Sequence, residues 1–168
     1  MDVLTKIVML EELESQMVHF RKTGKKVVFT NGCFDLLHLG HVRYLAAAKS
    51  EGHILVVGLN SDESVKKIKG DKRPIVEQAQ RAEVLASLWC VDYVTIFDEE
   101  DPLRLIETLK PDVLVKGEDW GEKEIVGADL VKRNGGRVIR ATMIADASTS
   151  SIIQRIVERY QKTKGPGH

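Results

Sequence analysis

The sequence predicts an α/β fold: a single domain built on a doubly wound, five-stranded parallel sheet of Rossmann-like type. Three observations lead to this prediction. Short apolar runs alternate with helix-forming stretches five times along the chain. The length of 168 residues suits one domain, and 43% apolar residues are enough for a core. No repeat or linker divides the sequence, so we treat residues 1–168 as one domain with its core over 25–162.

The first elements surround a strand and the turn after it. Apolar residues spaced for one face predict a helix over 9–23, which Gly24 would end. The β-branched run 27–30 predicts a buried parallel strand, and Asn31-Gly32 predicts a turn after it. The helix-forming run 42–49 predicts a helix that ends before Gly52.

The middle of the chain repeats this pattern. Residues 53–60 predict a second buried strand, and Ser61 with its neighbours offers the N-cap of a short helix. A basic loop is expected over 66–74. Periodicity predicts a helix over 78–88, and residues 93–97 predict the third strand.

The last third adds two more units. Asp101-Pro102 predicts the N-cap and first-turn pair of a helix that ends before Pro111. Strands are predicted over 113–116 and 137–141, with a helix over 126–134 between them. The last helix is expected from 152 to about 162, followed by a flexible tail over 163–168. A strand order of 3-2-1-4-5 would place the ends of the first and fourth strands side by side at the switch point of the sheet.

Charge and cysteine content limit the classes of function. Acidic and basic residues balance at 25 each, which argues against nucleic-acid binding because such domains are usually basic. Cys33 and Cys90 form neither a metal-binding spacing nor a disulfide framework, so a reduced, cytoplasmic protein is expected. The sequence shows no signal-peptide pattern, and no apolar run approaches the roughly 18 residues of a membrane span.

The turn and helix start at residues 31–41 predict a phosphate site. A strand, a glycine turn and a helix N-terminus bring free N–H groups and the positive end of a helix dipole to one point. His38 and His41 add imidazoles whose charge can change there. The spacing alone leaves a metal site or solvated histidines open, although zinc needs about three or four protein ligands and no further Cys/His cluster accompanies these two.

Two other segments could bind phosphate. The basic run 66–74 follows the second strand, at the sheet edge where ligands of such folds bind, and would suit a polyphosphate; a solvated surface is the alternative. Ser148, Thr149 and Ser150 precede the last helix, where hydroxyl groups cap the helix or hold phosphate.

Several motifs together resemble one family. They are Thr30-Asn31-Gly32-Cys33-Phe34-Asp35, the His38-x-Gly40-His41 core (HxGH), Asn60-Ser61-Asp62, Lys69-Gly70-Asp71-Lys72-Arg73-Pro74, Val115-Lys116-Gly117 and Ser148-Thr149-Ser150. Over residues 25 to 160 the chain resembles the D-glycero-β-D-manno-heptose 1-phosphate adenylyltransferases, a branch of the cytidylyltransferase-like nucleotidyltransferases. One segment departs from that branch, which has Lys-Gly-Gly-Asp-Tyr after the fourth strand. This chain has Lys116-Gly117-Glu118-Asp119-Trp120, which is closer to glycerol-3-phosphate cytidylyltransferases.

The resemblance implies a reaction and a set of roles. AMP would pass from ATP to the heptose 1-phosphate, giving pyrophosphate and ADP-heptose for lipopolysaccharide biosynthesis. His38, His41 and Lys69 would act on the reacting phosphates, with Mg²⁺ entering with ATP and held mainly by phosphate oxygens and water. The nucleotide would contact Cys33, Phe34, His41, Gly117, Glu118, Asp119, Ser148, Thr149 and Ser150. The acceptor would contact Asn31, Asp35, Asn60, Asp62, Lys72 and Arg73, although Asp35 could instead bond backbone in its own turn.

Two other functions stay open. Trp120 favours a cytidylyltransferase that acts on a polyol or amino-alcohol phosphate. A non-catalytic nucleotide-binding module is the other alternative, and the two histidines and the lysine-rich segment argue against it. The expected partners are small molecules, ATP and a sugar phosphate, with no nucleic acid, membrane or protein-held metal. The sequence leaves the oligomeric state open, a homodimer included.

Overall fold

The computed structural model of the chain has the predicted five-stranded parallel sheet. It describes residues 2–118, 121, 124–142 and 148–161, so Asp119, Trp120 and the tail 163–168 lie outside the described residues. The strands are β1 (Val27–Gly32), β2 (Ile54–Asn60), β3 (Tyr93–Phe97), β4 (Val113–Gly117) and β5 (Arg137–Ala141). Their order, β3-β2-β1-β4-β5, confirms the prediction and places β1 directly beside β4.

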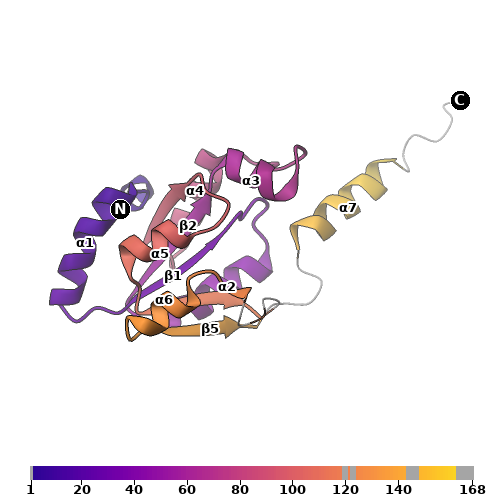
Figure 1. Cartoon of the computed structure of the whole chain (residues 1–168). Helices are drawn as coiled ribbons and strands as arrows, with labels where there is room; N and C mark the ends of the chain where they lie inside the picture. The colour runs from indigo at the N-terminus through magenta and orange to yellow at the C-terminus, as the bar shows by residue number, and fades with distance from the viewer. Residues whose placement is uncertain (1, 119–120, 122–123, 143–147, 162–168) are drawn as a thin grey trace, which may run out of the picture.

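Helices lie on both faces of this sheet (Figure 1). They are the 3-10 helix η1 (Val3–Lys6), α1 (Leu10–Lys22), α2 (Leu39–Ser50), α3 (Asp62–Lys69), α4 (Gln78–Ala86), α5 (Leu103–Leu109), α6 (Ala128–Arg133) and α7 (Thr149–Gln161). One hydrophobic cluster joins the sheet to α1, α5 and α6, and the other joins it to α2 and α4. The fold is therefore the doubly wound arrangement that the alternating pattern predicts.

The central strand β1 shows why its sequence is apolar on both sides. Val28 packs in the cluster beneath α2 and α4, and Phe29 packs in the cluster beneath α1, α5 and α6. Both side chains are completely buried. A parallel strand covered on both faces needs apolar residues at successive positions, which explains the continuous run that precedes Asn31.

Three predicted boundaries are wrong at the sheet edge that matters for function. β1 runs through Asn31 and Gly32, where a turn was predicted, because parallel pairing with β2 continues as far as Gly32 opposite Leu59. Residues 66–69, predicted as loop, form the last turn of α3. The last helix begins at Thr149 rather than at residue 152.

The remaining boundaries differ from the prediction by a few residues. The helix predicted over 78–88 ends at Ala86, and the one predicted over 126–134 begins at Ala128. The helix η1 was not predicted.

The C-terminal helix α7 projects away from the sheet in Figure 1. None of its residues is buried, and Ile156, Val157 and Tyr160 are exposed. Its first residue nevertheless lies against the main body, because Thr149 Oγ1 donates to the Leu36 carbonyl at 3.4 Å. Within the described part of the chain, no helix is both long and apolar enough to cross a membrane.

Candidate active site

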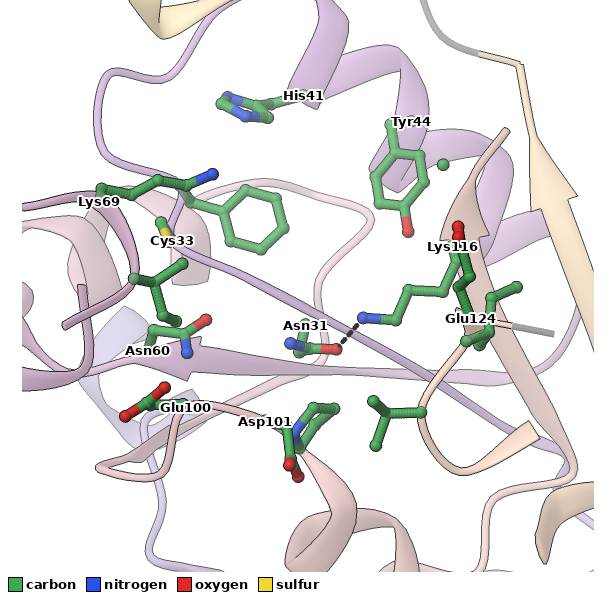
Figure 2. Close-up of a pocket in the computed structure, with 16 residues that line it drawn as sticks. Asn31, Cys33, His41, Tyr44, Asn60, Lys69, Glu100, Asp101, Lys116 and Glu124 are labelled. Atoms are coloured by element: carbon green, nitrogen blue, oxygen red, sulfur yellow. Dashed lines mark hydrogen bonds between the residues drawn. The ribbon is translucent and has the colours of Figure 1, made fainter. Parts of the chain in front are cut away.

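A cavity of about 280 Å³ opens at the carboxyl ends of the strands, where ligands of open α/β sheets bind (Figure 2). Residues from β1, β2, β4, α2 and α3 line it, together with the segments after β3 and before α6. The lining residues are Asn31, Cys33, Phe34, His41, Tyr44, Asn60, Ile68, Lys69, Glu100, Asp101, Pro102, Lys116, Gly117, Glu124, Ile125 and Val126. Seven of the residues predicted from the sequence are among them: Asn31, Cys33, Phe34, His41, Asn60, Lys69 and Gly117.

The HxGH motif forms the start of α2. His38 is the N-cap residue and makes no side-chain cap, so the first N–H groups of the helix have no side-chain acceptor from that position. The rings of His38 and His41 stack with centroids 3.8 Å apart and planes at 24°. Both Nδ1 atoms are buried without a hydrogen-bond partner among the described residues. This helix start therefore holds donors of the kind that bind an anion.

The two imidazoles are neutral at physiological pH. Burial lowers the pKa of His38, and burial together with the neighbouring His38 lowers the pKa of His41 to about 4. Two stacked rings that both carried protons would repel each other. An anion placed beside them would favour the protonated form, so the charge of this pair depends on what is bound.

The loop between β1 and α2 is held in one unusual conformation. Phe34 has a φ of 43°, in the left-handed region that side chains disfavour. Its ring lies edge-on to His41, with centroids 5.1 Å apart. A Cβ on Gly32 would meet the Phe34 ring at 3.0 Å, so glycine at that position allows the ring to fold back.

Asp35 anchors this loop to the segment before α4. Its carboxylate accepts hydrogen bonds from Arg73 Nε at 2.5 Å, Ile75 N at 2.8 Å and Val76 N at 2.9 Å. Burial alone would raise the pKa of Asp35, but the Ile75 and Val76 amides and the Arg73 guanidinium hold it below its usual value. The Asp35 side chain is fully buried, and these hydrogen bonds occupy its carboxylate. Asp35 therefore has a structural role, which the sequence left open as the alternative to binding the acceptor substrate.

The lysine-rich segment contributes one side chain to the cavity. Lys69 and Ile68 line it, and Figure 2 shows the Lys69 amine extending toward His41. Lys66 instead pairs with Glu63 on the exposed side of α3, and Lys67 and Lys72 are exposed outside the cavity. Arg73 also lies outside the cavity lining, held by Asp35. Lys69 lies in the last turn of α3, four residues after the buried Val65, whereas the pair with Glu63 holds Lys66 away from the cavity.

Arg81 is a central residue that sequence reasoning missed. It is completely buried and donates to the carbonyls of Cys33 at 2.5 Å, Asn60 at 2.9 Å and Val76 at 2.8 Å. It also forms an ion pair with Asp62 at 2.7 Å. Asp62, which was predicted to contact the acceptor substrate, therefore already has a partner within the protein. A charged residue on the apolar stripe of α4, one helical turn before Leu85, was the available signal.

Cys33 and Asn60 sit in the cavity at the ends of β1 and β2. Burial raises the pKa of the Cys33 thiol, and Lys69 and Arg81 oppose that effect without reversing it. The thiol is therefore not activated as a nucleophile. Asn60 Nδ2 donates to Ser64 Oγ at 2.9 Å, which fixes the orientation of its amide.

Lys116 and Tyr44 are further lining residues to which sequence reasoning gave no role. Lys116 Nζ donates to Asn31 Oδ1, as Figure 2 shows. Tyr44 hydrogen-bonds Thr30 Oγ1 at 2.7 Å and donates to the Val115 carbonyl at 3.0 Å, joining α2 to β1 and β4. Lys116 belongs to the Val115-Lys116-Gly117 motif, but its contact with Asn31 depends on the strand order.

The loop after β4 and the start of α7 flank the site. Gly117 lines the cavity, whereas Glu118 is exposed and its N–H donates to the Ala141 carbonyl at 3.0 Å. Ser148 Oγ accepts from Ser151 N at 3.1 Å and so caps α7. Thr149 faces the loop before the HxGH motif through Leu36, while Ser150 is exposed. The start of α7 therefore contacts the loop before the HxGH motif, and the strand order sets the end of β4, which carries Gly117, beside β1 as predicted.

Comparison with known proteins gives one consistent family. A cytidylyltransferase-like family model matches residues 29–155. The bifunctional protein HldE of Geobacter metallireducens is 60% identical over 137 residues, which are 82% of this chain and 28% of that protein. HldE of Syntrophotalea carbinolica is 51% identical over 158 residues, 94% of this chain and 32% of that protein. The chain thus spans about a third or less of the length of these relatives.

Solved structures agree with this result. A lipopolysaccharide core biosynthesis protein from Thermoplasma volcanium is 30% identical with a TM-score of 0.60, covering 72% of this chain and 98% of its own. A pantoate-beta-alanine ligase from Francisella tularensis, 18% identical with a TM-score of 0.63 over 95% of this chain and 79% of its own, shares the fold. The HxGH helix start, the strand order and the matched family model lead to one conclusion: the chain belongs to the cytidylyltransferase-like family.

Proposed function

We propose that the protein is an adenylyltransferase that transfers AMP from ATP to a sugar 1-phosphate, D-glycero-β-D-manno-heptose 1-phosphate, giving ADP-heptose and pyrophosphate. The observation that carries this proposal is the stacked His38–His41 pair at the start of α2, beside a cavity that also contains Lys69. The long motif string and the relatives named HldE support the heptose acceptor. The product would serve lipopolysaccharide synthesis, and the similarity to the lipopolysaccharide core biosynthesis protein of Thermoplasma volcanium supports this role.

The reaction requires positioning and charge stabilisation more than covalent catalysis. An oxygen of the acceptor phosphate attacks the α-phosphorus of ATP. The bond from that phosphorus to the bridging oxygen breaks, and its electrons leave with pyrophosphate. Charge builds on the departing oxygen, where the histidine pair and the free N–H groups of α2 would donate. Lys69 would neutralise a phosphate at the mouth of the cavity.

The free protein suits this role because its histidines are uncharged. With its pKa lowered to about 4, His41 would gain a proton only when the triphosphate arrives. Ser148 and Thr149 at the start of α7 would reach the terminal phosphates, since Thr149 already touches the loop before the HxGH motif. Gly117 and Glu118 would lie near the nucleoside.

Mg²⁺ is part of the proposal as a companion of ATP. Among the described residues, no group of three or more His, Cys, Asp or Glu is arranged to hold a metal ion. Phosphate oxygens and water would therefore supply most of its ligands. The ion would neutralise charge on the triphosphate. We also propose that the protein acts in the cytoplasm, where ATP is available.

A matrix of nucleotides and acceptors tests this function. Pyrophosphate release would be measured with ATP and with CTP, each against heptose 1-phosphate, glycerol 3-phosphate and phosphocholine. We expect release with ATP and heptose 1-phosphate and at least tenfold less in the other combinations. Preference for CTP with glycerol 3-phosphate or phosphocholine would establish the cytidylyltransferase alternative. Tight ATP binding without turnover on any acceptor would establish the non-catalytic alternative.

A further inference from the structure

We propose that Lys116 is a positioning and specificity residue. It fixes the amide of Asn31 so that Nδ2 donates a hydrogen bond to an oxygen of the acceptor sugar. This inference rests on the proposed function and adds a group that distinguishes an acceptor with hydroxyl groups from a simple phosphate ester. It begins from the hydrogen bond between Lys116 Nζ and Asn31 Oδ1 on the floor of the cavity.

The sheet holds these two residues opposite each other. β1 pairs with β4 in a register that sets Val28 against Val113 and Phe29 against Leu114. Continuing that register by two residues brings Asn31 to Lys116. The Tyr44 hydroxyl bridges the intervening positions, since it bonds Thr30 Oγ1 at 2.7 Å and the Val115 carbonyl at 3.0 Å. The pair is thus fixed by buried backbone and side-chain contacts rather than by a loop.

The chemistry of the lysine decides how the amide is turned. An ammonium group has only donors, so it must face the oxygen of the Asn31 amide and not its nitrogen. The Nδ2 group then points away from Lys116, and Figure 2 shows it on the far side of the amide. Asn31 lines the cavity, so Nδ2 offers donors to a ligand inside it. Without the lysine, the amide could rotate and present its oxygen instead.

The walls of the cavity complete the match to a sugar. The floor presents the donors of Asn31 and Lys116, and Glu100, Asp101 and Glu124 are among the lining residues. Asp101 Oδ1 accepts from Leu103 N at 2.9 Å and Glu124 Oε2 accepts from Gly121 N at 3.1 Å, which leaves each carboxylate a second oxygen. Sugar hydroxyls both accept and donate hydrogen bonds, so they can accept from the donors on the floor and donate to carboxylate oxygens of the lining residues.

Three variants test the proposal: Lys116→Met, Asn31→Ala and the double variant. For each we would measure the KM of ATP and of heptose 1-phosphate, and kcat/KM for methyl phosphate, which keeps the phosphate but lacks the hydroxyls. Lys116→Met and Asn31→Ala should each raise the KM of heptose 1-phosphate about tenfold. The ATP KM and the kcat/KM for methyl phosphate should each change less than twofold. The double variant should be no worse than either single one, because both disrupt the same contact.

Two controls separate positioning from a general loss of charge or fold. Lys67→Met removes an exposed lysine outside the cavity and should leave the acceptor preference unchanged. Lys116→Arg keeps a group that has only donors and should retain most of the preference for heptose 1-phosphate over methyl phosphate. Thermal unfolding would confirm that each variant is folded.

The outcomes are distinguishable. If the wild type turns over heptose 1-phosphate and Lys116→Met keeps its acceptor preference, the positioning role is wrong while the proposed function stands. Equal losses on both acceptors would show a merely structural or electrostatic role and would also overturn it. If calorimetry and turnover detect no interaction of the wild type with heptose 1-phosphate, the proposed function and this inference fall together.

Discussion

Replacing Arg81 with methionine should destabilise the protein strongly, because this guanidinium joins three segments around the site. Arg81 donates to three carbonyls, and its fourth contact is the Asp62 carboxylate. Each buried acceptor left without a donor costs about 1–3 kcal/mol. The Asp62 side chain is 28% exposed, so water can replace that contact. Loss of the donor to all three carbonyls should therefore cost about 3–9 kcal/mol of stability. Water that enters the truncated site can donate to these carbonyls, so we expect a cost in the lower half of that range.

We therefore expect Arg81→Met to lower the free energy of unfolding by about 4 kcal/mol. For a chain of this size that corresponds to a fall in Tm of roughly 8–16 °C. Chemical denaturation and thermal unfolding would be followed by circular dichroism, with the exposed Arg133→Met as the matched control. At 25 °C, turnover should also fall roughly 10- to 100-fold, since the Cys33 and Asn60 carbonyls lose their anchor. A Tm within about 3 °C of the wild type would show that Arg81 is not needed for stability, because these carbonyls would then find other donors at little cost.

The remaining predictions concern the phosphate-binding groups. His41→Ala should lower kcat about 100-fold or more with a smaller loss of ATP affinity, which steady-state kinetics and calorimetry would measure; near-normal turnover would remove His41 from the chemistry. Because the folded pKa of His41 is about 4, below the unfolded value of 6.5, the unfolded state takes up the proton first as pH falls. The wild type should thus lose up to about 3 kcal/mol of stability between pH 6.5 and 4, and the same titration of His41→Gln should show a shallower decline. Lys69→Ala should reduce kcat/KM about tenfold and Lys67→Ala less than twofold, and equal small effects would support a solvated surface instead. Thr149→Ala should weaken the use of ATP about tenfold with little change in Tm; a large fall in Tm with unchanged kinetics would leave only a structural role.

The sheet and most of the helices around it could be predicted because short sequence patterns indicate them. The apolar run at Val28 and Phe29 predicts a buried strand in any context, and alternation with helices predicts the parallel sheet. The turn predicted at Asn31-Gly32 failed because pairing with β2 extends the strand there. A pairing partner on a distant strand overrides a local turn preference.

The candidate site was predictable where one short motif carries the chemistry. His38, His41 and the helix start belong to a single turn, so their proximity follows from the sequence. The contact of Lys116 with Asn31 joins residues 85 apart in the sequence and exists only in this strand order. The hydrogen bond from Arg81 to the Cys33 carbonyl likewise depends on how the fold arranges α4 and β1. Contacts between groups that the topology brings together can be identified only from the structure.

The position of Lys69 on a helix shows a different limit of prediction from the sequence. A run of lysines with a glycine suggested a loop, yet Ser61 caps a helix whose inner face buries Ser64 and Val65. The lysines occupy the other faces of that helix. The charged residues therefore concealed the amphipathic period of this helix, which places Lys69 one turn after the buried Val65.

The proposed reaction is a direct attack of the acceptor phosphate on the α-phosphorus of ATP, with no covalent intermediate on the protein. It is tested most directly by the stereochemistry of the reaction with ATP bearing a chiral α-thiophosphate and heptose 1-phosphate. A single in-line displacement predicts an ADP-heptose thio analogue of inverted configuration at that phosphorus. Retention would instead reveal two successive displacements through a protein nucleophile such as Cys33, which is incompatible with direct attack.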